Sequence, residues 1–215
     1  MRPNSALAMA LVAILPSCAK IPPGSAPGAL PGPPGASSFV SQFEARVSAP
    51  EGSVRFRGVL AAAPGGRLRI ELTGPSVAAP LLLVAGPEGI SALLLAERLF
   101  YRGPAGAPLI EEISGLPARP ADLAGILTGE RSDPPVGCKA WFGRWAFVSP
   151  DGRIPRRVKL RCGAAALRVS LEGPRPLPPR SGDLPAQDPF APIAPRVGDR
   201  VVDLPEFVRA LRPAD

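Results

Sequence analysis

Histidine is absent from this chain of 215 residues. Without it the protein has no Ser-His-Asp or Cys-His catalytic group, no histidine ligand for zinc and no histidine general base. The glycine-rich turns lack the lysine and the spacing of a phosphate-binding loop. Glu111 and Glu112 are adjacent on a predicted helix and therefore point in different directions. We expect no catalytic residue, no metal site and no cofactor, and hence a protein that is not an enzyme.

Lysine and aromatic residues are scarce. The formal charge is +7, aromatic residues make up 5% of the chain, and the only lysines are Lys20, Lys139 and Lys159. The arginines that carry the remaining positive charge are scattered singly, with no basic run and no interleaved aromatic platform. Charge that is spread in this way focuses little electrostatic field, so we expect no nucleic-acid partner.

Proline and glycine are abundant, and their placement divides the chain. The 31 prolines and 23 glycines gather near the N-terminus and after Gly173, while the middle is rich in alternating apolar residues. Residues 18–38 cannot bury a core and read as a tether. We therefore expect one folded domain over residues 39–212, with an irregular excursion over residues 173–195.

The first seventeen residues have the pattern of a secretory signal. A positively charged start precedes the apolar run 6–15, which is too short to span a bilayer as a helix. Leu15-Pro16-Ser17-Cys18 resembles the lipobox of bacterial lipoproteins, although Pro16 replaces the usual small residue. The resemblance implies that Cys18 is acylated and anchors the protein to lipid; the alternative is an ordinary signal peptide with an incidental cysteine. Ala19 is not the aspartate that retains such lipoproteins at the inner membrane, which implies the outer membrane.

The middle of the chain predicts mostly strands. Residues 67–73 alternate apolar and polar side chains, and the apolar runs 80–85 and 90–96 are joined by the turn Gly86-Pro87-Glu88-Gly89. A fourth short strand is expected over residues 98–102. These apolar runs need cover on both faces, and we expect lipid against the second one.

The remaining segments complete an α+β pattern. Residues 39–47 have helical apolar spacing, residues 108–114 and 120–128 predict two further helices, and a last helix is expected over residues 204–211. Strands are expected over the following ranges: 53–63, 139–148, 157–161, 167–172 and 200–203. About eight antiparallel strands with two inserted helices predict an incomplete antiparallel β-barrel, or half-barrel, with helices covering its concave face.

Two cysteines remain if Cys18 is acylated. Cys138 and Cys162 lie almost symmetrically about the turn signal Pro150-Asp151-Gly152, so a hairpin brings them nearly opposite each other. An even number of cysteines in an exported protein favours a disulfide. Two free core cysteines, or a metal held by the two thiols, are the alternatives.

The order of elements resembles the periplasmic lipoprotein carrier and the outer-membrane lipoprotein receptor, the LolA/LolB-type family. The resemblance covers roughly residues 39–204, with a shorter N-terminal helix and no match for the proline-rich segment. It is carried by these segments: Leu72-Thr73-Gly74-Pro75 with Leu81-Leu82-Leu83, residues 98–101, Gly115-Leu116-Pro117 with Leu123, Ile126-Leu127 and Gly129, and residues 190–204.

The resemblance implies a cavity for acyl chains inside the half-barrel. The expected cavity residues are Leu68, Ile70, Leu72, Leu81, Leu83, Leu93, Leu95, Trp141, Trp145, Val158 and Leu160. The expected lid residues on the two inserted helices are Ile113, Leu116, Leu123, Ile126 and Leu127. In the loop 74–80, Val77 is expected to touch the membrane, as in the receptor's protruding loop; the alternative is that Val77 is tucked inward.

The function implied is that of a lipid-anchored protein on the periplasmic face of the outer membrane. It would bind acyl chains of lipoproteins, or similar amphiphiles, and help insert them into that membrane, with a periplasmic carrier protein as a further partner. The alternative is an envelope scaffold lipoprotein that uses the same fold to hold a protein partner.

Overall fold

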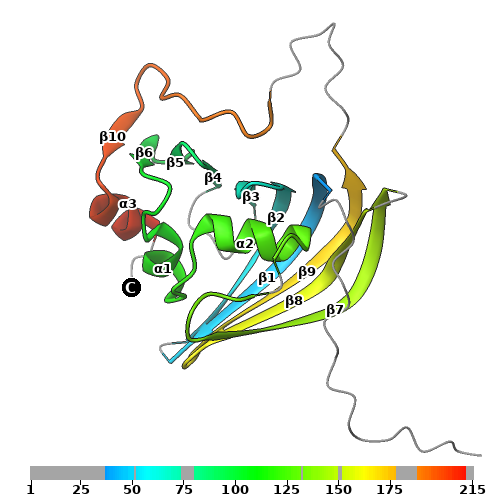
Figure 1. Ribbon diagram of the computed structural model, residues 1–215. Coiled ribbons are helices and arrows are strands. Elements are labelled where there is room, and N and C mark those ends of the chain that lie inside the picture. Colours follow the sequence, from blue (N-terminus) through cyan, green and yellow to red (C-terminus); the bar gives the residue numbers. More distant parts are fainter. Residues whose placement is uncertain are drawn as a thin grey trace, which may run out of the picture. The chain divides into compact units, whose positions relative to one another are not determined.

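One bent sheet dominates the computed structural model, which describes residues 37–50, 52–73, 80–131, 133–149, 152–177 and 188–211 (Figure 1). These residues all belong to the compact unit 31–215. The sheet has ten strands in the order β10-β6-β5-β4-β3-β2-β1-β9-β8-β7, and it is open because β10 and β7 are its two edges. The fold is therefore the expected half-barrel type, a mostly antiparallel open sheet with few helices.

The strands and helices follow one another in two blocks. The first block contains β1 (Phe39–Ala49), β2 (Gly52–Ala63), β3 (Arg67–Leu72), β4 (Leu81–Gly86), β5 (Gly89–Leu94) and β6 (Leu99–Gly103). The helices α1 (Leu109–Ser114) and α2 (Pro120–Thr128) come next. The second block contains β7 (Cys138–Ser149), β8 (Gly152–Cys162), β9 (Ala165–Pro176), β10 (Arg200–Val202) and α3 (Leu204–Leu211).

The prediction of a helix over residues 39–47 is wrong, because this segment is the long strand β1. Its buried residues alternate strictly as Phe39, Ser41, Phe43, Ala45 and Val47, which is the period of a strand. β1 lies between β2 and β9 and pairs with both, so both edges of its backbone are hydrogen-bonded. The apparent helical spacing came from Val40, which is only half-buried.

The predicted meander and helices are otherwise confirmed. Gly86 pairs with Gly89 across the turn between β4 and β5. Helix α2 begins at Pro120, where the missing N–H costs nothing, and ends before Gly129, whose φ of 75° is the left-handed cap that glycine favours. Helix α3 occupies residues 204–211, as expected.

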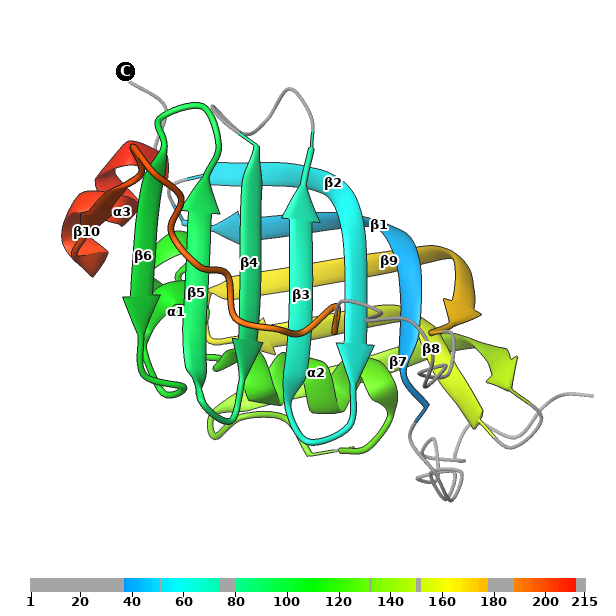
Figure 2. The same cartoon turned by 90° about the horizontal axis from the view of Figure 1, so that it is seen from above.

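Strand β10 differs from the prediction in its direction. It pairs with β6 in parallel, with Arg200 opposite Leu99 and Val202 opposite Tyr101, whereas an antiparallel strand was expected. Parallel neighbours need a crossover connection. The connection from β6 to β10 here includes α1, α2 and β7–β9. Its last described part, residues 188–199, is called the crossing segment below and runs over the outer face of the β3–β6 half (Figure 2).

The crossing segment is attached to the strands beneath it. The Arg69 Nη1 group donates to the Pro189 carbonyl at 3.2 Å, and the Ile193 N–H donates to Ser91 Oγ at 3.0 Å. Val84 and Leu93 point to this outer face and are nevertheless buried. The chain itself thus covers the outer face of these strands, and the expected lipid contact stays a prediction for their inner face.

The core lies inside the bend of the sheet. Helix α2 packs against β2, β3 and β4 on one side and against β8 on the other. Because seven of its nine residues are buried, the helix is apolar nearly all round, as is typical of an internal helix. The strands β3–β6 run across the strands β7–β9 on either side of this helix (Figure 2).

Candidate functional site: an apolar cavity inside the half-barrel

An apolar cavity of about 130 Å³ lies between the two halves of the sheet and the inserted helices. Among the described residues of its lining, the only one with a hydroxyl group is Ser114, whose Oγ donates to the Ile110 carbonyl at 2.6 Å. The lining residues are Phe43, Ala45, Val47, Phe56, Leu60, Leu68, Ile70, Leu72, Leu81, Leu83, Ile110, Ile113, Ser114, Leu116, Leu123, Ile126, Leu127, Val158, Leu160, Leu167 and Val169. The cavity therefore offers apolar contact and almost no hydrogen bonding.

Strand register places these side chains on one face. Ile70 lies opposite Leu83, and Leu72 lies opposite Leu81, so the apolar residues of β3 and β4 form neighbouring rows. On the other half, Leu160 lies opposite Leu167 and Val158 opposite Val169. Each row follows from the period of two, because alternate residues of a strand point to the same face.

Seven of the eleven cavity residues expected from the sequence line this cavity: Leu68, Ile70, Leu72, Leu81, Leu83, Val158 and Leu160. The five expected lid residues line it as well, from α1, α2 and the connection between them: Ile113, Leu116, Leu123, Ile126 and Leu127. The structure thus brings the expected strand and helix residues together around one space.

Four expected cavity residues lie elsewhere. Leu93 is on the outer face of β5, since Ala92 and Leu94 on either side of it belong to the core, and Leu95 follows β5 in a turn and is 49% exposed. Trp141 is 44% exposed, with the Lys159 ammonium 5.1 Å from its ring centroid. Trp145 packs instead with Phe142 and the Arg153 guanidinium. The apolar character of these residues was read correctly, but for Leu93 and Trp141 the face of the strand was not, and Leu95 lies outside the strand.

The sequence reasoning missed the cavity residues of β1, β2 and β9; those of β2 are Phe56 and Leu60. Phe43, Ala45 and Val47 were assigned to a helix, and Leu167 and Val169 of β9 were read as an alternating strand without a cavity role. Their signal was present in the sequence, because each set recurs at every second position. Register between strands, which the sequence does not display, decides that both sets face the same space.

The predicted disulfide joins Cys138 and Cys162, which are 24 positions apart and lie directly opposite each other on β7 and β8. Two other predictions, the acylated Cys18 and the membrane-contacting Val77, lie outside the described residues.

Ionisable groups contribute little to the cavity. Burial raises the pKa of the Tyr101 phenol above its ordinary 10.0; Tyr101 faces the core, and its ring lies 5.8 Å from that of Phe207. Among the described residues, no group of three or more His, Cys, Asp or Glu is placed to hold a metal ion. No helix in the described part of the chain is both long and apolar enough to cross a bilayer.

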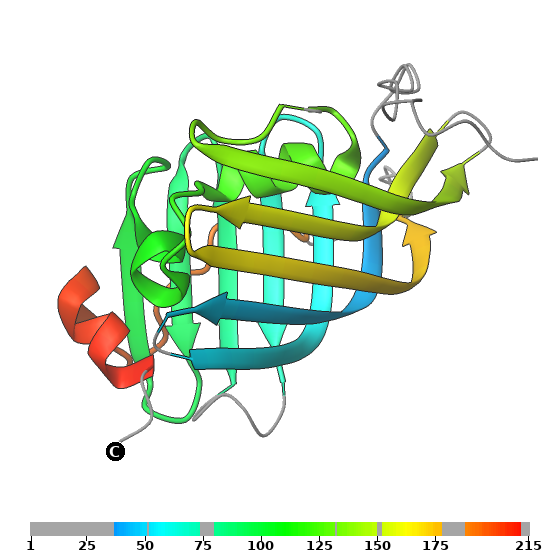
Figure 3. The same cartoon turned by 90° about the horizontal axis from the view of Figure 1, so that it is seen from below.

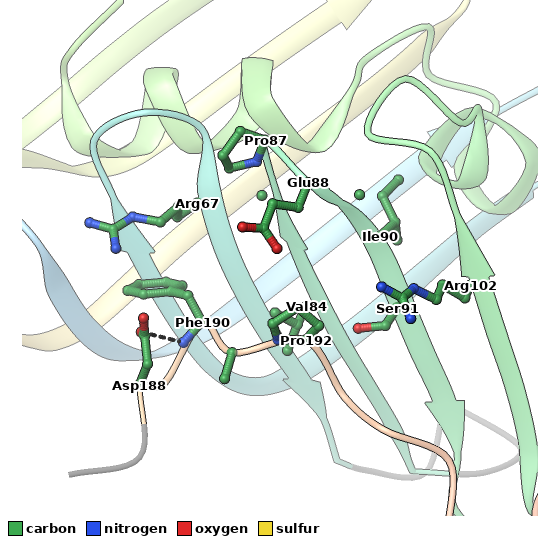
Figure 4. A pocket seen from close by; sticks show the side chains of 13 residues that line it. Arg67, Val84, Pro87, Glu88, Ile90, Ser91, Arg102, Asp188, Phe190 and Pro192 are labelled. Carbon is green, nitrogen blue, oxygen red and sulfur yellow. Dashed lines mark hydrogen bonds between the residues drawn. The ribbon is translucent and has the colours of Figure 1, made fainter. Parts of the chain in front are cut away.

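A second pocket, of about 330 Å³, lies on the outer face under the crossing segment (Figure 4). It is polar as well as apolar, with Arg67, Glu88, Arg102 and Asp188 in its lining. The Arg67 guanidinium lies 5.2 Å from the centroid of the Phe190 ring, and the Phe190 N–H donates to Asp188 Oδ1 at 3.0 Å. The first contact joins the crossing segment to β3, and the second lies within the segment itself.

No family model and no curated protein matches the chain. Solved structures similar to it include a LolA superfamily protein from Nitrosomonas europaea, with 8% identity, a TM-score of 0.46, and coverage of 67% of this chain and 88% of that one. A domain named as an outer-membrane lipoprotein-sorting protein from Vibrio parahaemolyticus has 8% identity, a TM-score of 0.48, and coverage of 69% and 88%. A DUF1329 family protein from Desulfovibrio piger has 9% identity, a TM-score of 0.42, and coverage of 65% and 85%. The LolA superfamily is the one that the sequence resembles, and function is inferred below from the cavity itself.

Proposed function

We propose that the protein binds acyl chains of lipoproteins, or similar amphiphiles, inside the half-barrel, without catalysis. The observation that carries this proposal is the cavity lined by both halves of the sheet and by α1 and α2, with no charged group among the described residues of its lining. Burial of each methylene contributes about 0.8 kcal/mol, so about ten methylenes would supply about 8 kcal/mol, the scale of micromolar binding. No polar chemistry is needed for such a ligand.

The cavity must enlarge to hold a whole chain. Its volume of about 130 Å³ is below the roughly 300–1,000 Å³ of ordinary ligand sites. We propose that α1 and α2 cover the concave face as a lid and move outward when a ligand enters. Gly115, with a φ of 67°, ends α1, and the short connection that follows it separates the two helices.

The proposed location is the outer membrane, on its periplasmic face, with Cys18 as the lipid anchor. The resemblance of residues 15–18 to a lipobox and the resemblance of the folded part to the LolA/LolB-type family support this placement. In the proposed role the bound acyl chains pass from a periplasmic carrier through this protein into the membrane.

Ligand binding can be tested with a fluorescent fatty acid and the purified full-length chain. Ile113 lines the cavity from α1 and is only half-buried, so Ile113→Asp should leave the fold intact. We expect affinity to fall at least about tenfold, because a carboxylate in an apolar lining lacks compensating partners. Val136→Asp is the matched control, since Val136 is fully exposed and should bind as the parent does.

Lipid mass spectrometry on the protein purified from its host complements this assay. Acyl chains that co-purify with the parent and are depleted in Ile113→Asp support the proposal. No co-purifying lipid, together with equal probe binding by both variants, would contradict acyl-chain binding and favour the scaffold alternative.

A further inference from the structure

The outer face of the other half of the sheet gathers the scattered basic residues. Alternate residues of β2, β1, β9, β8 and β7 point away from the core, and no described helix or strand crosses them (Figure 3). We call this surface the basic face and define it by its outward cations: Arg46, Arg55, Arg57, Lys139, Arg157, Lys159, Arg161 and Arg168. The carboxylates among them are Glu44 on β1 and Glu172 on β9.

Strand register aligns four of these cations in one row. Arg55 lies opposite Arg46, and Arg46 lies opposite Arg168 on its other side. Arg168 then lies opposite Lys159, and Lys159 opposite Trp141. The row thus crosses four strands and ends at a tryptophan on the edge strand.

This row is only partly neutralised within the protein. Glu44 forms ion pairs with Arg55 at 3.3 Å and with Arg57 at 3.0 Å, and the Arg46 Nε group donates to Ser53 Oγ at 2.7 Å. Within the described ranges, no carboxylate pairs with Arg168 or Arg157. Like charges directly opposite on a sheet destabilise it, so an external anion would relieve a cost that the fold carries by itself.

Exposed aromatic side chains belong to the edge strand β7. Phe147 is 76% exposed and, like Trp141, belongs to β7. Aromatic side chains beside cations are typical of surfaces that rest on lipid headgroups, because the rings enter the interface while the cations contact phosphates.

We propose that the basic face docks on an anionic lipid surface, with Trp141 and Phe147 entering the headgroup region. The face is a broad sheet surface with charge spread across five strands, which suits a planar array of phosphates. This inference goes beyond acyl-chain binding, because it concerns the outer side of the sheet and needs no ligand in the cavity.

Vesicle co-sedimentation tests the proposal. The full-length chain with Cys18→Ser, which removes the acylation site, is mixed with vesicles of phosphatidylglycerol and phosphatidylcholine or of phosphatidylcholine alone. We expect binding to the anionic vesicles that weakens as salt is added. Replacing Arg46, Lys159 and Arg168 with glutamine should weaken it about 100-fold, at about fivefold for each residue.

A matched triple variant controls for net charge. Arg102, Arg196 and Arg209 are exposed and lie off the basic face, so their replacement with glutamine should reduce vesicle binding much less. The thermal midpoints of both triple variants report folding, and we expect the basic-face variant to be at least as stable as the parent because a row of like charges is removed. Phe147→Ser should weaken anionic-vesicle binding about tenfold with no effect on the midpoint.

Several results would overturn the proposal. Equal losses of vesicle binding in the two triple variants would mean that net charge alone, and not the basic face, causes the binding. Binding to neutral vesicles that matches binding to anionic ones would remove the role of the cations. Tight binding to heparin or duplex DNA without vesicle binding would assign the face to another polyanion. We expect the basic-face variant to bind fatty acid as the parent does, because the two sites are independent. A failure of the vesicle-docking proposal therefore leaves the cavity proposal intact.

Discussion

The two halves of the sheet have the same kind of inner face and different outer faces. In the β3–β6 half, the outer face carries Val84, Leu93 and Phe100, and these are buried where the crossing segment runs over the strands. In the half formed by β1, β2 and β7–β9, called the uncovered half below, the outer face carries cations and no described helix or strand covers it. Both faces are built from the same alternation, so the identity of every second residue decides which face needs a cover and which can meet water or an anion.

The difference has a cost on each side. In the covered half, the crossing segment buries the outer residues, and ordering this segment costs conformational entropy. The uncovered half needs no such segment but keeps like charges opposite one another, and β7 has a neighbour on one side only. The disulfide joins this edge strand to β8. Matched substitutions in the two halves should show how much the ordered segment and the opposed charges each change stability.

The largest effect should come from Phe207, the buried aromatic residue of α3. Phe207 of α3 is fully buried and packs against Tyr101, so Phe207→Ala should lower the free energy of unfolding by about 3–5 kcal/mol. Phe147→Ala, in the uncovered half, should change it by no more than about 0.5 kcal/mol. Chemical denaturation of both variants measures the contrast, and equal losses would mean that burial of Phe207 and exposure of Phe147 do not decide what each ring contributes to stability.

The disulfide should matter mainly in the uncovered half. Replacing both Cys138 and Cys162 with serine should lower stability by about 3 kcal/mol, because the cross-link restricts the unfolded chain. Hydrogen exchange should accelerate in β7 more than in β4, since only β7 lies at an edge that the cross-link holds. Freely alkylatable thiols in the native parent, or unchanged stability, would contradict this expectation.

The attachment of the crossing segment should have an intermediate effect. Ser91→Ala removes the acceptor of the Ile193 N–H and should cost about 1–2 kcal/mol if that N–H is left without a partner. Faster exchange of the Ile193 amide, measured by nuclear magnetic resonance, identifies the cause. An unchanged exchange rate would show that Ser91 does not hold the segment.

The smallest effect should be a gain. Arg168→Gln interrupts the row of cations and should raise stability by about 0.2–1 kcal/mol at low ionic strength. Added salt should diminish this gain, because it screens the repulsion in the parent. Arg102→Gln on the covered half serves as control and should show no such salt-dependent gain.

Much of the fold follows from local patterns. Alternation and apolar runs identified the meander from β2 to β6. Proline and glycine signals identified the residues at which α2 begins and ends. The cysteine pair followed from its symmetry about the hairpin turn. These features depend on residues near one another in sequence, which is why sequence reasoning reached them.

The remaining features depend on distant pairings. The helix prediction over residues 39–47 failed because Phe39, Val40, Phe43 and Val47 also fit a helix, and pairing with β2 and β9 decides in favour of the strand. Leu93 and Trp141 were assigned to the cavity because composition marks them as apolar without giving their face. The basic row was missed for the same reason, since its four cations come from four strands and are adjacent only through register.

The parallel pairing of β10 with β6 also sets an order in time. Arg98 and Asp199, which form an ion pair where the crossing segment meets this edge, are 101 positions apart in the chain. A chain that emerges from its N-terminal end therefore completes β4, β5 and β6 long before the segment that covers them exists. During that interval Val84, Leu93 and Phe100 are available to any other unfinished chain, a known route to aggregation. Partners that shield nascent chains should bind this protein most strongly before residues 188–211 emerge.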